Sequence, residues 1–189
     1  MVLEWFIPAV LLILGLWITL MHRRLSSLRR GAITSWGPLG KALQQRHDLA
    51  APLAQLVLSR APAQKRLTEA MMTARNAALK ADLSPMITSQ AETRLANAMM
   101  RVFALAKTQS DLAMDPGFQR LQARFERLDD EITAAQDAFN QAALQYNHAA
   151  MSVPAVLVAK YARLTVIEPF GLGTIGREAM RNAARGKGP

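Results

Sequence analysis

The chain has 189 residues, of which 51% are hydrophobic, and it carries no cysteine and a net charge of +9. The lack of cysteine excludes a disulfide framework, a thiolate metal site and a cysteine nucleophile. The apolar content is too high for an intrinsically disordered chain, and the 10 glycines and 9 prolines are too few for collagen or low-complexity material. This composition predicts one domain of ordinary size with room for a membrane segment.

The first predicted element is an uncharged apolar run from Trp5 to Met21. A helix from about Val2 to His22 reaches roughly the 30 Å of a bilayer core at 1.5 Å per residue. A cleaved signal peptide is one alternative, but it needs basic residues before the apolar run and small residues after it, and here the order is reversed. A buried core helix is the other, and the length of the run argues against it. The run therefore predicts one transmembrane helix.

The charges around this helix predict its orientation. Glu4 precedes the run, and four arginines follow it, at Arg23, Arg24, Arg29 and Arg30. Because positive residues are retained on the cytoplasmic side, we expect the N-terminus outside and the remainder in the cytoplasm, at the inner membrane. The same arginines suit the anionic lipids of the inner leaflet.

The distribution of net charge disfavours nucleic-acid binding. Residues 1–30, 31–176 and 177–189 each carry +3, so two-thirds of the excess lies in the two terminal segments. A nucleic-acid binder more often has a basic face on its folded body, with aromatic residues for stacking. The expected partner of the basic ends is therefore the bilayer.

Beyond the apolar run, the spacing of apolar residues predicts helices throughout. The first helix continues from the membrane segment and has inward positions at Trp36, Leu39, Leu43, Arg46, Ala50, Leu53 and Val57. One of these inward positions is an arginine. The residues that weaken this helix are Gly31, Gly37, Pro38, Gly40 and Pro52. Because a proline inside a helix removes one backbone hydrogen bond and crowds the preceding turn, we expect breaks in it.

Three further helices follow. Two shorter ones are predicted at about 62–81 and 85–107, and residues 108–115 are expected to form a loop. The longest starts at Pro116, with Asp115 as its N-cap, and ends before Pro154. Its apolar residues form a row, the seam, at Phe118, Leu121, Phe125, Leu128, Ile132, Ala135, Phe139, Ala142, Tyr146, Ala149 and Val153. A period of 3.5 over about five heptads predicts a bundle or coiled-coil contact.

Antiparallel packing of neighbouring helices returns the end of the longest helix to the bilayer. Residues 153–170 are apolar there, but they are too few and too charged for a second span. We expect them to lie on the membrane surface or to cover the end of the bundle. The tail beyond repeats an arginine at every fourth position, at Arg177, Arg181 and Arg185. It is either a weak amphipathic helix at the membrane surface or a frayed, solvated end.

Four motifs, taken in order, resemble those of one family. They are WGPLGKALQQRHDLAAPL at 36–53, Ala74-Arg75, DLAMDPGFQRLQ at 111–122, and ITAAQDAFNQAALQYN at 132–147 followed by Pro154. Their order and spacing are similar to those of the LemA family from Trp36 to Phe170. Departures from the family pattern are Ala51-Pro52 in place of Pro-Asn, Gln136 in place of Arg, Phe139 in place of Tyr, and a short basic tail.

This resemblance implies an N-terminal membrane anchor and an antiparallel α-helical bundle. The family has no established enzymatic activity, so the resemblance supplies no catalytic residues. Some relatives are associated with magnetosome membranes, which favours a role in organising membranes or membrane complexes. The predicted division is an anchor with a basic juxtamembrane segment at 1–30, a helical bundle at 31–170 and a basic tail at 171–189.

The motifs contain four polar residues with expected interior roles, Arg46, Arg75, Asn140 and Asn147. The two asparagines are seven residues apart, so they occupy equivalent positions beside the seam. We expect them to hydrogen-bond across the bundle to Arg46 or Arg75 and to fix its register at some expense of stability. A ligand or partner site built on the same residues is the alternative.

The sequence contains no recognisable catalytic or cofactor motif. Its histidines, His22, His47 and His148, lack the helical spacing of a zinc site. The Gly-rich run at 171–176 follows no predicted strand and lacks the ending of a phosphate loop. His47-Asp48 and the acidic run at 129–131 are a conceivable carboxylate cluster, but successive residues on a helix face different directions. We therefore expect that run to be a solvated face, and we expect no metal, no cofactor and no enzyme.

Taken as a whole, the sequence predicts an all-α protein, in which an N-terminal transmembrane helix is followed by an antiparallel bundle of about four long helices. The expected function is a non-enzymatic scaffold or adaptor for other membrane proteins at the inner membrane. One alternative is a lipid- or nucleic-acid-binding module that uses the basic termini. Another is a hydrolase without a recognised motif. Self-association of the bundle stays open.

Overall fold

The computed structural model describes residues 2–81, 85–106 and 108–171, and within these ranges all regular structure is helical. The elements are α1 (Val2–Arg60), η1 (Pro62–Gln64), α2 (Lys65–Leu79), α3 (Pro85–Ala106), α4 (Ser110–Ala113), α5 (Pro116–Met151) and α6 (Ala155–Tyr161). The predicted all-α class is confirmed. The short helix α4 lies where a loop was expected.

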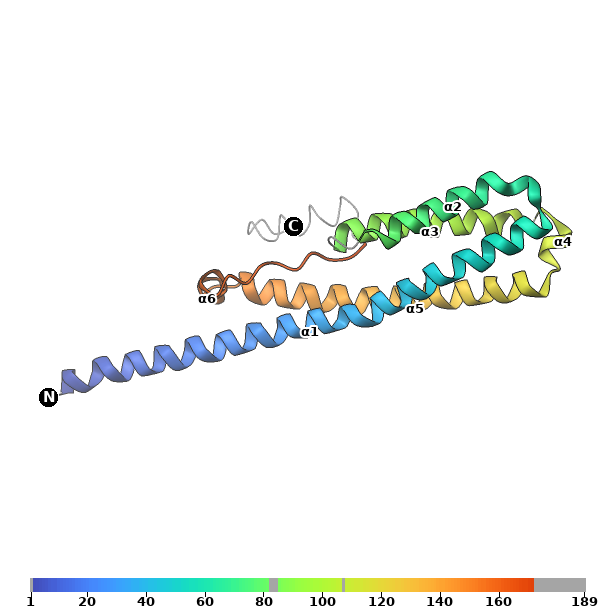
Figure 1. Ribbon diagram of the computed structural model, residues 1–189. Helices are drawn as coiled ribbons and strands as arrows, with labels where there is room; N and C mark the ends of the chain where they lie inside the picture. The colour runs from blue at the N-terminus through green and yellow to red at the C-terminus, as the bar shows by residue number, and fades with distance from the viewer. Residues whose placement is uncertain (1, 82–84, 107, 172–189) are drawn as a thin grey trace, which may run out of the picture.

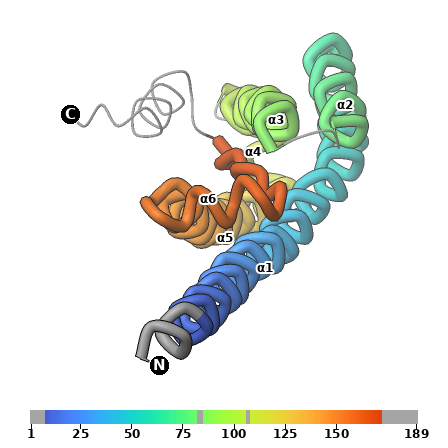
Figure 2. The backbone as a smooth tube through the Cα atoms, turned by 90° about the vertical axis from the view of Figure 1, so that its left-hand side faces the viewer, coloured from blue at the N-terminus to red at the C-terminus, as the bar shows by residue number. Residues whose placement is uncertain are grey.

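The molecule is elongated because its two longest helices, α1 and α5, pack side by side (Figure 1). The pair α2 and α3 covers the half of this assembly that lies away from the N-terminus. The N-terminal end of α1 extends beyond every other helix, and α6 lies at the end of the bundle nearest to it. Figure 2 shows the same arrangement along the bundle axis, with α6 lying over α5 and beside α1.

The expected breaks in α1 are wrong, because α1 is one helix from Val2 to Arg60 with Pro8, Pro38 and Pro52 inside it. Each proline removes only one backbone hydrogen bond. Tertiary packing compensates next to Pro38 and Pro52, since Leu39 and Leu53, the residues that follow them, are fully buried against the other helices. Packing of an apolar face, more than helix propensity, decides whether a helix persists.

The inward positions of α1 are confirmed. Trp36 is half-buried, and the other predicted positions, Arg46 included, are buried. The main core joins α1, α2, α3 and α5 in the half of the bundle away from the N-terminus. Two smaller clusters continue along α1 and α5, one around Trp36 and Phe139 and one around Leu25 and Tyr146.

The seam of α5 is confirmed over its first two-thirds and then shifts. Phe118, Phe125, Leu128, Ile132, Phe139 and Tyr146 are buried. Near the C-terminal end, however, burial moves from Ala142 and Ala149 to Ala143, Asn147 and Ala150. An ideal helix drifts by about 20° per heptad against a 3.5-residue repeat, which accounts for the shift. Val153, the last predicted seam residue, lies beyond α5 and is 85% exposed.

The ends of α5 and α6 are fixed by local hydrogen bonds. The side chain of Asp115 accepts from the backbone N–H groups of Gly117 and Phe118, so the predicted N-cap is confirmed. At the end of α6 the Leu164 N–H donates to the Ala159 carbonyl and the Arg163 N–H to the Lys160 carbonyl. This is a Schellman motif, with Arg163 at φ +52° in the position that glycine usually occupies.

The exposed N-terminal part of α1 has the character of a membrane segment. Its large apolar residues from Val10 to Leu20, Trp17 excepted, are 43–70% exposed. Within the described residues, α1 is the helix that is long and apolar enough to cross a membrane, and little of its most apolar stretch is buried. A soluble bundle rarely leaves so long an apolar surface uncovered. The fold is therefore that of a membrane-associated helical protein.

Candidate functional site

A cluster of charged side chains is buried between α1 and α3. Arg46 Nη2 of α1 donates to Glu92 Oε2 of α3 at 2.5 Å, and His47 Nε2 lies 2.5 Å from Glu92 Oε1. Arg46, His47 and Glu92 are 4%, 6% and 2% exposed. Arg46 and His47, consecutive residues of α1, thus each contact one oxygen of the Glu92 carboxylate. We refer to these three residues as the polar cluster.

The electrostatics of the polar cluster favour an ionised Glu92. Burial alone raises the pKa of a carboxyl group, because it penalises the charged form. The hydrogen bonds from His47 and Arg46 and the attraction of their charges outweigh burial, so the pKa of Glu92 is lowered. An ionised carboxylate is an acceptor only, and the contact at Nε2 therefore places a proton on that nitrogen of His47.

Two further residues extend the polar cluster toward α2 and α5. Arg75 Nε of α2 donates to the backbone carbonyl of His47 at 2.8 Å, which ties α2 to the middle of α1. Arg46 Nη1 lies 3.8 Å from Asp129 of α5, whose side chain is 57% exposed. Both predicted arginines thus lie at contacts between helices, Arg46 at the centre of the cluster and Arg75 at its edge.

A cavity of about 230 Å³ lies beside the polar cluster and is lined by His47, Glu92, Trp36 and Thr88 among others. Nδ1 of His47 and Nε of Arg46 are buried and have no hydrogen-bond partner among the described residues. The hydroxyl of Thr88, near the start of α3, donates to the carbonyl of Ala81, two residues after α2 ends. The cavity is therefore bordered by a histidine and an ionised carboxylate, while the two unpartnered nitrogens themselves are buried.

The acidic run at 129–131 is exposed on α5, as expected for a solvated face. Asp48, the other acid considered with His47, is also exposed, and it accepts a hydrogen bond from Gln44 on its own helix. Among the described residues, no group of three or more His, Asp or Glu side chains is arranged to hold a metal ion.

The two predicted asparagines bind a different part of the molecule from the one expected. Residues 163–171, which we call the strap, leave α6 and run back along α5 (Figure 1). Asn147 donates to the Ile167 carbonyl and accepts from the Ile167 N–H, at 2.8 and 2.9 Å. Asn140 makes the same pair of bonds with Phe170, both at 2.8 Å. The expected bonds from these asparagines to Arg46 or Arg75 are therefore wrong.

The spacing of the asparagines matches an extended chain. Seven residues along α5 cover about 10 Å, at 1.5 Å per residue. The three steps from Ile167 to Phe170 cover about the same distance at roughly 3.3 Å per residue. Because Asn147 meets the earlier strap residue and Asn140 the later one, the strap runs antiparallel to α5.

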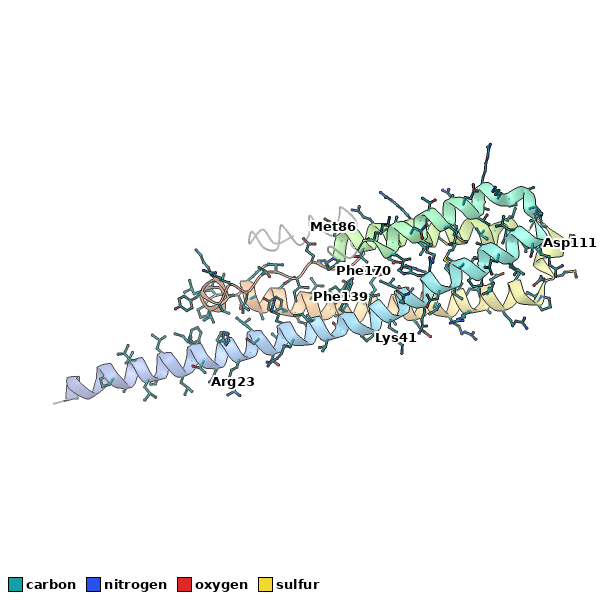
Figure 3. The ribbon with its side chains drawn as sticks, in the orientation of Figure 1. Arg23, Lys41, Met86, Asp111, Phe139 and Phe170 are labelled. Carbon is teal, nitrogen blue, oxygen red and sulfur yellow. The ribbon has the colours of Figure 1, made fainter. Side chains whose placement is uncertain are left out.

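Two contacts with aromatic residues and one glycine complete the strap's attachment. Tyr146 Oη donates to the Thr165 carbonyl at 3.0 Å. Phe170 packs edge-on against Trp36 at 5.7 Å between ring centroids, and Trp36 packs against Phe139 at 5.1 Å. Figure 3 shows Phe139 and Phe170 near each other in the middle of the molecule. Gly171 follows at φ +77°, a conformation that side chains disfavour. Residues 153–170 thus cover one side of the bundle along with its end.

The predicted membrane-surface arginines do not share one environment. Arg23, Arg24 and Arg30 are exposed, whereas Arg29 is half-buried, and its Nε is buried with no hydrogen-bond partner in the described ranges. Arg29 lies beside Tyr146, whose pKa is raised by burial in spite of that positive charge. Residues 177, 181 and 185 lie outside the described residues.

Sequence reasoning missed Glu92, His47 as its partner, and the strap. The signal for Glu92 was present, because a buried arginine at position 46 requires an acid, and Glu92 adjoins the inward-facing Ala91. The signal for the strap was weaker, since it consisted of the asparagine spacing and the apolar residues after Pro154.

Comparison with known proteins gives a family and nothing narrower. A search of curated proteins finds no match. The model of the LemA family matches residues 35–181, a range that contains the polar cluster, α5 and the strap and begins one residue before Trp36. This match covers well over half of the chain, and the chain therefore belongs to the LemA family.

Proposed function

We propose that this protein is a single-pass membrane protein whose cytoplasmic helical bundle is a non-enzymatic scaffold or adaptor for other membrane proteins at the inner membrane. The observation that carries the proposal is the continuity of α1 from its exposed apolar half to Arg60. One helix forms both the membrane segment and a wall of the bundle, so the bundle cannot turn independently of its anchor.

The proposed orientation rests on Arg23, Arg24 and Arg30, which are exposed directly after the apolar run. Positive residues at this position favour the cytoplasmic side. The bundle then projects into the cytoplasm and presents the outer face of α5 at a fixed height above the bilayer. That face mixes charged and small residues, among them Arg127, Asp130, Ala134 and Ala138, all of them exposed.

The proposal needs no cofactor and no reaction. Each charged group of the polar cluster has a charged partner within it, and Arg75 joins that cluster to a third helix. A carboxylate shared between α1 and α3, with Arg75 tying α2 to the backbone of α1, fixes the register of three helices, which suits a rigid bundle. Other membrane proteins are the proposed partners, and the bundle is also free to contact a second copy of itself through the same face.

Photo-crosslinking in cells with mass spectrometry tests the scaffold. Photoreactive residues replace Ala134 and Ala138 on α5, and a control probe replaces Ala70 on the exposed face of α2. We expect one recurrent membrane-protein partner at the α5 probes, lost in Arg127→Glu/Asp130→Lys while the urea midpoint of the full chain in detergent is unchanged. Crosslinks to lipid or self alone would contradict the scaffold.

The absence of native cysteine allows a direct test of orientation. Single cysteines replace Val2, before the span, and Glu69, on α2. A membrane-impermeant maleimide is expected to label Val2→Cys in spheroplasts and Glu69→Cys only after lysis. The reverse pattern would place the bundle outside the cytoplasm.

A further inference from the structure

The short helix α6 lies across the membrane segment of α1. In Figure 1 α6 is seen end-on while α1 is seen along its length, and in Figure 2, turned by 90°, α6 is seen from the side. Its inner residues Ala155, Val158 and Ala159 are buried in the cluster that also contains Leu25 and the half-buried Trp17 of α1. A helix held across a membrane-spanning helix runs parallel to the membrane plane.

The other side of α6 is apolar and uncovered. Leu157 and Tyr161, four residues apart, are 68% and 94% exposed, and Val153, in the turn that precedes α6, is 85% exposed. An interval of four places side chains on one face of a helix. Lys160 and Arg163 are exposed at the same end of the molecule. An apolar face with flanking cations is the pattern of a helix that lies in a membrane interface.

An open groove of about 600 Å³ separates α6 from α1, and its walls are mostly apolar. Leu14, Trp17 and Ile18 line it from α1, and Leu157, Val158 and Tyr161 line it from α6. Leu14 and Ile18 belong to the exposed apolar stretch of α1, so whatever covers that stretch also reaches the groove.

The depth of the groove agrees with the membrane interface. Its α1 wall runs from Leu14 to His22, which is about 12 Å along a helix. Interfacial helices are buried to roughly 5–10 Å in the boundary between headgroups and acyl chains. Arg23 and Arg24 come directly after this wall, at the level where lipid phosphates would lie.

We propose that α6 is an in-plane membrane helix, seated at the interface beside Arg23, and that phospholipid acyl chains fill the groove between α6 and α1. This proposal rests on α1 spanning the bilayer, as in the proposed function, but not on the scaffold role. Two membrane contacts at right angles then fix the rotation and the tilt of the bundle, which a single spanning helix leaves open.

Spin labelling of the full chain in phosphatidylcholine–phosphatidylglycerol nanodiscs tests the position of α6. Single cysteines replace Leu157, Ile13 in the exposed apolar half of α1, and Met114, which is 78% exposed between α4 and α5 at the far end of the bundle. Power saturation compares collision with oxygen, which enriches in lipid, and with a water-soluble nickel chelate. We expect the ratio at Leu157→Cys to be lipid-like, lower than that at the deeper Ile13→Cys and well above that at Met114→Cys.

The three labels separate the possible failures. A water-like ratio at Leu157→Cys with a lipid-like ratio at Ile13→Cys overturns the in-plane helix and leaves the anchor intact. Water-like ratios at both positions overturn the anchor as well.

A phosphatidylcholine with a diazirine on its acyl chain tests the groove. We expect mass spectrometry to find crosslinks at residues 157–162, and Ala162→Trp, which places an indole at the groove wall, to reduce them severalfold. The matched control is Ala138→Trp on the exposed face of α5. Crosslinks that are absent from 157–162, or unchanged by Ala162→Trp in a chain with normal helical content, overturn groove occupancy.

Discussion

At the scale of single residues, the most consequential group is an arginine in a position that pattern alone would assign to an apolar side chain. Arg46 is 4% exposed and shares the carboxylate of Glu92 with His47. A buried ion pair contributes little net stability over a well-packed apolar pair, but removing one partner leaves a buried charge uncompensated. The polar cluster therefore determines which packing of the helices is adopted more than it adds to the free energy of unfolding.

Glu92→Gln is expected to destabilise the bundle by about 3–5 kcal/mol, because Arg46 then keeps its charge with no buried counter-charge. The double variant Arg46→Met/Glu92→Leu removes both charges and is expected to recover most of that loss. Urea unfolding of the full chain in detergent, followed by far-UV circular dichroism, measures both. Equal destabilisation of the two variants would show that the uncompensated charge of Arg46 is not the cause of the lost stability.

The lowered pKa of Glu92 predicts a dependence of stability on acid. A carboxyl group whose pKa is lower in the folded state stabilises the fold above its unfolded pKa, near 4.5, and loses that contribution as the pH falls through the folded pKa. As the pH is lowered from 5, the melting temperature of the wild type should therefore fall more steeply than that of Glu92→Gln. Asp115→Asn is a positive control: the pKa of Asp115 is also lowered, so the loss of its carboxyl group should make the fall less steep too. Parallel curves for wild type and Glu92→Gln would refute the assignment.

Arg163 is the residue whose backbone conformation suits its side chain least. A non-glycine residue in the left-handed region carries a penalty of about 1–2 kcal/mol, and Arg163 is at φ +52°. Arg163→Gly is expected to stabilise the turn after α6 by roughly 1 kcal/mol. Arg163→Ala removes the same side chain but keeps the strain, so it separates backbone from charge in the same unfolding assay. A gain in Arg163→Ala equal to that in Arg163→Gly would assign the effect to charge.

At the scale of elements, the motif at 132–147 has a structural role, which is to hold the strap against α5. The stretch 132–147 supplies Asn140, Tyr146 and Asn147, and each of them hydrogen-bonds the backbone of the strap. These bonds are made to main-chain atoms, so they hold the path of the strap and do not by themselves constrain its side chains. The strap's own sequence is constrained at Phe170, which is buried against Trp36, and at Gly171, which adopts φ +77°.

Asn147→Ala is expected to destabilise the bundle by about 2–3 kcal/mol, since it leaves two backbone groups of Ile167 without partners in a half-buried site. The effect should be local first, so hydrogen exchange at the Ile167 and Phe170 amides is expected to accelerate before global unfolding. Gln141→Ala, at an exposed position of the same helix, is the matched control. Unchanged exchange in Asn147→Ala would show that aromatic packing alone holds the strap.

Much of this arrangement could be predicted from the sequence, for reasons that are local. The apolar run, the inward positions of α1, the N-cap at Asp115 and the first part of the seam depend on spacing along one helix. The partner of Arg46 depends on how α3 meets α1, and spacing within one helix does not contain that information. The asparagine interval of seven is compatible with a facing helix and with an extended chain, and only the structure distinguishes them.

At the scale of the whole molecule, the membrane segment and the bundle are joined by one continuous helix, α1. Leu16 and Lys41 lie on either side of Gly31, Gly37 and Pro38, and both side chains are exposed. A continuous helix separates their Cα atoms by about 38 Å, at 1.5 Å for each of the steps between them. Any motion of the anchor, such as a change in tilt, is then transmitted to the far end of the bundle.

Pulsed EPR between labels at Leu16→Cys and Lys41→Cys is expected to give one narrow distance distribution near roughly 38 Å. A second pair on α5, Arg120→Cys and Ala138→Cys, provides the width expected for an unbroken helix. A much broader or shorter distribution for the α1 pair would show a hinge at the glycines, and the fixed orientation proposed for the bundle would fail with it.

The pairing of α1 with α5 also has a consequence for synthesis. Leu43 on α1 and Phe139 on α5 share one core cluster, yet roughly a hundred residues separate them in the chain. At translation rates of about 5–20 residues per second, α1 waits roughly 5–20 s for its partner helix. During that time the apolar N-terminal segment of α1 is able to enter the membrane, while the face of α1 that will pack against α5 is still exposed. The newborn chain therefore passes through a stage in which chaperones, or a neighbouring copy of α5, have access to a surface that the finished molecule conceals.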